Sequence, residues 1–133
     1  MRRIENIIIH CTATPEGREV TVSQVDAWHK ARGFRGIGYH YLIYLDGSIH
    51  AGRPEQEMGA HCTGYNLHSI GVCYVGGLDK NTLQPKDTRT AAQKAALHTL
   101  VAELQGRYKG SEVHGHNEFA AKACPCFRVK DEF

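Results

Sequence analysis

The chain lacks most of the features that mark exported, membrane-spanning or nucleic-acid-binding proteins. Lys and Arg number 16 against 14 Asp and Glu, and these basic residues are scattered, which disfavours a dedicated nucleic-acid binder. The opening segment, MRRIENIIIH, is charged and then briefly apolar, and its apolar run is too short for a signal peptide or a membrane span. We therefore expect a chain made in the cytoplasm without a signal peptide, and neither a membrane nor a nucleic acid as its partner.

A complete disulfide framework is also excluded, because the chain has five cysteines, an odd number. In a chain without an export signal, Cys and His that cluster together more often bind metal or take part in catalysis than form crosslinks. Internal repeats, low-complexity segments and linkers are missing as well. The 133 residues, of which 41% are hydrophobic and 23% charged, fit one globular domain over residues 1–133, which we expect to be a monomer.

Several short segments have the composition of β-strands. The β-branched run that ends at His10 predicts a buried strand. Asp46-Gly47, between two β-rich runs, predicts a hairpin. SIGVCYVGG (69–77) and SEVHGH (111–116) predict two further strands. Because a hairpin is antiparallel, a sheet that contains it together with parallel strands must be mixed.

Two segments have the pattern of helices. Thr21 is followed three residues later by Gln24, and Thr90 by Gln93, so each pair predicts a capping box at a helix start. The apolar positions of the two helices that follow are Val22, Val25 and Trp28 in the first, and Leu97, Leu100, Val101, Leu104 and Tyr108 in the second. Alternating strands and helices predict an α/β fold: a single domain with a mixed central sheet of about five strands, flanked by helices.

The segment HGHNEFAAKACPCF (114–127) suggests a metal site. On an extended strand His114 and His116 point to the same side, and with Cys124 and Cys126 they could form a closed tetrahedral zinc site. Paired cysteines in structural sites are usually spaced more widely than these two, so this signal has limited specificity.

His10 offers a second arrangement. It lies at the carboxyl end of the first predicted strand, which is a common functional position in α/β sheets. With one histidine and one cysteine from segment 114–127 it would make three protein ligands, with a water molecule in the fourth position, as in a catalytic zinc site.

Four segments, taken together, resemble the zinc-dependent N-acetylmuramoyl-L-alanine amidases. They are IIIHCTAT, GIGYHYLIYLDGSIHAGR, HCTGYNLHSIGVCYVGG and GHNEFAAKACPCF, in this order and spacing. More narrowly, the chain resembles the short phage lysozymes that are amidases, and it is similar to peptidoglycan recognition proteins. The resemblance extends from His10 to Phe127. It implies zinc-dependent hydrolysis of the amide bond between N-acetylmuramic acid and L-alanine in peptidoglycan, as in phage endolysins.

The resemblance also implies roles for particular residues. The metal ligands match His10, His116 and Cys124, with one Zn²⁺ per chain, and the catalytic residues match Tyr39 and Lys122. Since the chain has no HExxH motif, it lacks the glutamate base of the common metalloproteases, and Tyr39 is the residue we expect in its place.

Other positions carry weaker implications. The segments that contain His40, His61 and Asn66 match the substrate groove, so we expect these side chains to contact sugar or peptide. Cys126 and His114 match no ligand position, and Cys126 stands where the family usually has a small or polar residue. Glu118 follows His116 closely, and it could either support that ligand or form a salt bridge in the loop.

Alternative functions remain open at this stage. One is a module that binds peptidoglycan without cutting it, but such relatives typically lack the cysteine that Cys124 provides here. Others are a structural zinc protein that uses both segment cysteines, a zinc peptidase with another substrate, and a cytoplasmic amidase that recycles soluble muropeptides. The short chain and the closer motif match favour the phage type, which would act on the cell wall after release.

Overall fold

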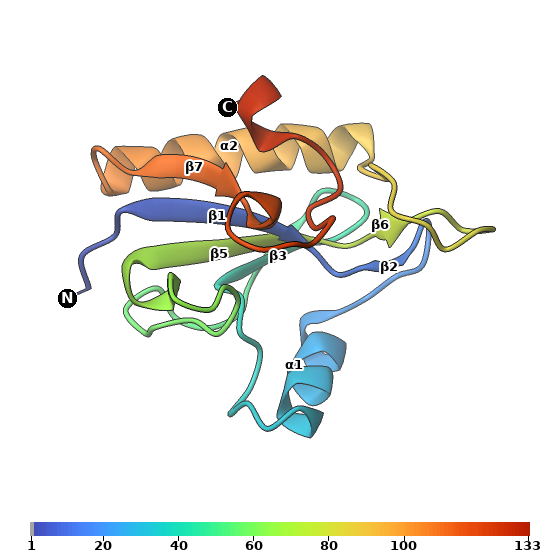
Figure 1. Cartoon of the computed structure of the whole chain (residues 1–133), viewed down its shortest axis with the longest axis horizontal. Coiled ribbons are helices and arrows are strands. Elements are labelled where there is room, and N and C mark those ends of the chain that lie inside the picture. The colour runs from blue at the N-terminus through green and yellow to red at the C-terminus, as the bar shows by residue number, and fades with distance from the viewer. Residues whose placement is uncertain (1) are drawn as a thin grey trace.

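The isoleucine-rich strand predicted before His10 lies in the interior of the sheet. In the computed structural model, which describes residues 2–133, this strand is β1 (Asn6–Cys11), and Ile7, Ile8 and Ile9 are fully buried. The strand order in the sheet is β4-β3-β5-β1-β7, so β1 has a neighbour on both edges (Figure 1). A β-branched run buried on both faces is what such an interior strand requires.

The sheet is mixed, as predicted. β1 pairs in parallel with β5 (Ser69–Tyr74) and β7 (Glu112–Gly115), and β5 pairs in parallel with β3 (Tyr41–Ile43). Among the strands of this sheet within residues 2–133, only β3 and β4 (Ile49–Ala51) pair antiparallel, and they form the hairpin predicted at Asp46-Gly47. A separate two-stranded sheet pairs β2 (Thr14–Pro15) with β6 (Gly77–Leu78).

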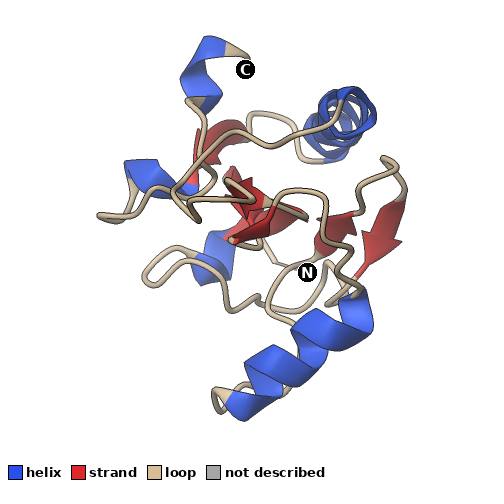
Figure 2. Cartoon of the chain, turned by 90° about the vertical axis from the view of Figure 1, so that its right-hand side faces the viewer, coloured by secondary structure: helices blue, strands red, loops and turns tan. Residues whose placement is uncertain are grey.

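The two long helices lie on opposite faces of the sheet (Figure 2). Leu97, Leu100, Val101 and Leu104 of α2 (Ala91–Arg107) pack in one core cluster with Ile7 and Ile9 of β1. Val25 of α1 (Val22–Ala31) packs in a second cluster with Leu42 and Cys73. Since side chains alternate along a strand, His10 points away from the α2 face, towards the side on which α1 lies.

The helix starts agree with the sequence, whereas one predicted core position does not. Both Thr21–Gln24 and Thr90–Gln93 form capping boxes with both reciprocal bonds present. Trp28, however, is 38% exposed, and His29 takes the buried position next to it. The imidazole Nδ1 accepts the backbone N–H of Gly38 at 2.8 Å, which offsets the cost of burying a polar ring.

The last strand is shorter than the sequence suggests. β7 ends at Gly115, and His116 begins a 3-10 helix, η2 (His116–Glu118). His114 and His116 therefore do not share one strand face, which was the premise of the four-ligand site. Two further 3-10 helices are η1 (Asn66–His68) and η3 (Val129–Asp131), and no helix within residues 2–133 has the length and apolar character needed to cross a membrane.

Candidate metal centre and active site

The fold brings His10, near the start of the sequence, together with His116 and Cys124, near its end. His10 comes from β1, His116 from the first position of η2, and Cys124 from the loop that follows. One ligand atom from each lies within 4.8 Å of the other two, so this group can hold a metal ion. His10 Nδ1 lies 3.9 Å from Cys124 Sγ. A nitrogen and a sulfur on one tetrahedral zinc would be about 3.6 Å apart, so two imidazoles and one thiol in this geometry fit zinc.

The protonation states of these groups also suit a metal ion. Burial, reinforced by the neighbouring His61 and His116, holds the pKa of His10 well below 6.5, so its ring is neutral near pH 7. Hydrogen bonds from the Cys11 side chain and from the Cys11 backbone N–H lower the pKa of the Cys124 thiol. Neutral imidazole and thiolate are the forms that bind metals.

His114 and Cys126 lie outside this group. His114 Nδ1 lies 2.8 Å from Glu118 Oε1, and the other carboxylate oxygen of Glu118 accepts the Gly115 N–H. Cys126 Sγ lies 3.8 Å from Cys11 Sγ instead. The arrangement does not form the closed His-His-Cys-Cys site, and the Glu118 carboxylate contacts His114 and the Gly115 N–H within the loop.

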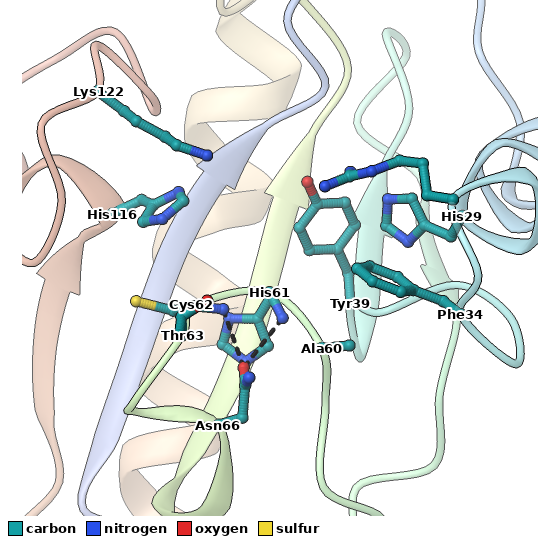
Figure 3. A pocket seen from close by; sticks show the side chains of 11 residues that line it. His29, Phe34, Tyr39, Ala60, His61, Cys62, Thr63, Asn66, His116 and Lys122 are labelled. Carbon is teal, nitrogen blue, oxygen red and sulfur yellow. Dashed lines mark hydrogen bonds between the residues drawn. The ribbon is translucent and has the colours of Figure 1, made fainter.

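A pocket of about 280 Å³ opens beside the ligands, and it contains both predicted catalytic residues. Figure 3 shows His116 and Lys122 on one side of this pocket and Tyr39 on the other. The Tyr39 ring centroid is 5.1 Å from that of His10. Burial raises the pKa of the Tyr39 hydroxyl well above 10, so it is a neutral hydrogen-bond donor at pH 7. Lys122 is exposed at the rim, and its ammonium group supplies positive charge.

The three predicted substrate-contact residues have different surroundings. His61 and Asn66 line the pocket, and Asn66 Oδ1 accepts the backbone N–H groups of His61 and Cys62, both at 2.9 Å (Figure 3). His40 lies outside it, is 1% exposed, and its Nδ1 accepts the Gly71 N–H at 3.0 Å. Substrate contact by His40 stays a prediction that this burial does not favour.

Sequence reasoning missed two neighbours on the other side of the pocket. Arg32 and Phe34 both line it, and the Arg32 guanidinium carbon lies 5.0 Å from the centre of the Phe34 ring. A signal was present, since both lie in the turn between the end of α1 and the GYH motif. Neither residue type is informative by itself, because an arginine at the end of a helix usually faces solvent.

An α/β sheet that holds a His-His-Cys group able to bind a metal ion, beside a pocket with Lys122 at its rim, is the arrangement expected of a metal-dependent hydrolase. The N-acetylmuramoyl-L-alanine amidase family matches residues 1–127, nearly the whole chain. The chain therefore belongs to that family, and the prediction that it is an amidase is confirmed.

Individual relatives agree with this assignment. An endolysin of Klebsiella phage KP32 is 42% identical over 124 residues, which cover 93% of this chain and 82% of the relative. Peptidoglycan-recognition protein SC2 of Drosophila melanogaster is 31% identical, covering 94% of this chain and 70% of its own length. The solved structure of N-acetylmuramoyl-L-alanine amidase LysC from Clostridium intestinale URNW matches with a TM-score of 0.83 at 29% identity, over 98% of this chain and 82% of that one. The predicted fold and family are confirmed.

Proposed function

We propose that the chain cuts the amide bond between N-acetylmuramic acid and L-alanine in bacterial cell-wall peptidoglycan, with one Zn²⁺ held by His10, His116 and Cys124. The observation that carries the proposal is that these three side chains converge and that one of them, His116, lines a pocket together with Tyr39 and Lys122. Three protein ligands leave a fourth coordination position free, which distinguishes catalytic from structural zinc sites.

The ion would act as a Lewis acid that makes water a nucleophile near neutral pH. The side chains around it supply the rest of the chemistry. When water attacks the lactyl carbonyl, negative charge develops on the carbonyl oxygen, and the Lys122 ammonium at the rim stabilises that charge. The Tyr39 hydroxyl donates a hydrogen bond to water or substrate and so fixes the orientation of the reactants. Its neutral state at pH 7 suits donation rather than proton abstraction.

One argument favours the intact cell wall over soluble muropeptides as the substrate. The phage relatives are named as endolysins. The enzyme would reach this substrate after release from the cytoplasm. A non-catalytic binding module is the weaker alternative, because Cys124 is present and completes the ligand group.

The test is to incubate the purified protein with peptidoglycan, with and without a chelator of divalent metals. We expect new alanine amino groups, no new reducing sugar ends, and loss of the reaction with the chelator. New reducing ends would instead indicate a glycosidase, for which a flanking pair of carboxylates is usually needed. Binding without release of amino groups from either wall or muropeptides would refute the proposal and support a recognition module. Parallel assays on intact wall and on muropeptides decide between the two substrates.

A further inference from the structure

The two ring nitrogens of His10 have different neighbours. Nδ1 faces Cys124 Sγ at 3.9 Å, on the side where the metal ligands converge. Nε2 lies 2.8 Å from Nδ1 of His61. A neutral imidazole carries one hydrogen, so if Nδ1 gives its lone pair to the metal, the hydrogen must be on Nε2 and is donated to His61.

The same reasoning continues through His61. Its Nδ1 accepts from His10, which leaves its own hydrogen on Nε2, 3.2 Å from the Ser69 hydroxyl oxygen. Ser69 is fully buried at the start of β5. The two hydrogen bonds thus run in one direction: His10 donates to His61, and His61 donates to Ser69. Both ring nitrogens of His61 have partners within the protein, so neither is left free for a substrate hydrogen bond.

Packing holds the His61 ring in this place. The two rings meet edge to face, with centroids 4.8 Å apart and an interplanar angle of 90°. A Cβ atom at Gly71 or at Gly59 would lie 2.7 Å from His61 Cδ2, so the absence of a side chain at both positions makes room for the ring. Asn66 fixes the backbone of His61 from the other side, as Figure 3 shows.

We propose that His61 is a positioning residue for the metal ligand His10: it accepts the Nε2 hydrogen of His10 and thereby presents the Nδ1 lone pair to the metal. The proposal rests on the proposed function, because it needs a metal at this site. It gives His61 a role different from the substrate contact expected from the sequence.

The test compares two variants of similar size. His61→Asn keeps an acceptor, because the asparagine Oδ1 can take the place of the imidazole Nδ1, whereas His61→Leu removes it. We expect His61→Leu to weaken zinc binding by about 10- to 100-fold, the usual effect of losing such a partner. His61→Asn should stay within about threefold of wild type. His98→Leu is the matched control, because the His98 side chain is exposed on α2, and this variant should bind zinc like wild type.

Two readouts other than activity decide the outcome. The first is the zinc dissociation constant, measured by competition with a chromophoric chelator. The second is the visible spectrum of the Co²⁺-loaded protein, which reports ligand geometry, and which should change in His61→Leu but not in His61→Asn. If His61→Leu fails to fold, Ser69→Ala offers a milder variant, for which we expect severalfold weaker zinc binding and a native melting curve without metal.

Each contrary result has a distinct meaning. Wild-type zinc affinity and cobalt spectrum in His61→Leu, with a raised KM for muropeptide, would overturn the positioning role and assign His61 to substrate binding. Equal loss of zinc in His61→Leu and His61→Asn would also overturn it, because packing alone would then explain the residue. If the wild-type protein bound no zinc but still released amino groups from peptidoglycan, the metal assignment itself would be wrong.

Discussion

Cys124 and Cys126 are separated by one residue, yet their sulfur atoms have different surroundings. Cys124 Sγ accepts the Cys11 N–H at 3.3 Å and lies within the metal-ligand group, whereas Cys126 has a left-handed backbone with φ of 68° and contacts the Cys11 thiol. The two thiols are therefore not interchangeable, although their spacing alone could not have distinguished them.

This difference predicts the metal content of four variants. His10→Ala and Cys124→Ala should lose zinc, because each removes one of only three protein ligands. His114→Ala and Cys126→Ser should retain about one zinc per chain, which mass spectrometry under native conditions can measure. Loss of zinc in the second pair together with retention in His10→Ala would favour the closed four-ligand site.

The catalytic roles proposed for Lys122 and Tyr39 lead to a prediction for kinetics. Lys122→Ala should retain zinc and its fold but lose roughly 10²- to 10³-fold in kcat, the usual effect of removing one donor that stabilises an oxyanion. Tyr39→Phe removes only a hydroxyl and should lower kcat by at least about tenfold, with unchanged zinc content. The assay is release of alanine amino groups from peptidoglycan. Unchanged kcat in both variants would refute these roles without refuting the amidase assignment.

At the scale of single elements, the two helices have the same capping motif but different surroundings. Gln24 caps α1 at an exposed position. Gln93 caps α2 and is fully buried, and its Nε2 also donates to the carbonyl oxygens of Val75 at 3.0 Å and Ile43 at 3.4 Å. α2 is thus hydrogen-bonded to the sheet as well as packed against it.

A matched pair of substitutions tests this difference. Gln24→Ala should cost roughly 0.5–1 kcal/mol in the free energy of unfolding, because it removes an exposed capping bond. Gln93→Ala should cost about 2–4 kcal/mol, because it also removes the amide that donates to the buried Val75 carbonyl and one of the two donors to the Ile43 carbonyl, which keeps the Val75 N–H. Urea unfolding of both variants measures the costs. Equal costs would show that the two additional bonds to the sheet contribute little.

The sequence predicted those elements whose signals are local. Capping boxes, the Asp46-Gly47 turn and the isoleucine run each depend on neighbours a few residues apart, and each was found in the structure. Trp28 was assigned to the wrong face because a bonding partner for His29, the Gly38 N–H, comes from a distant turn. The candidate ligand group was predicted from the resemblance, whereas no sequence pattern indicated the contact between His61 and His10, which are 51 positions apart.

For the molecule as a whole, acid stability depends on buried histidines. Burial is the main cause that lowers the pKa of His40 to about 4 and that of His61 to about 3. In the unfolded chain both side chains take up a proton below about pH 6.5, whereas in the folded protein they remain neutral until the lower values are reached. The unfolded state therefore binds more protons in this range, and stability falls as the pH falls from 6.5.

We expect the metal-free protein to lose about 3 kcal/mol of stability through His40 alone between pH 6.5 and 4, since each unit of pKa shift corresponds to about 1.4 kcal/mol. Urea unfolding at several pH values, with a chelator present, measures how the free energy of unfolding depends on pH. His40→Gln should make this dependence on pH shallower. A stability that is constant from pH 7 to 5 would contradict the assignment of neutral buried rings.

The proposed metal ligands come from segments near the two ends of the sequence. His10 and Cys124 are 114 residues apart, and their segments meet only because β1 lies beside β7 in the sheet. If a protease removes either of these terminal segments, the remaining molecule keeps most of its mass but no longer has a complete set of proposed ligands. In a stored preparation, the ratio of bound zinc to total polypeptide therefore measures the intact fraction, which absorbance alone would overestimate.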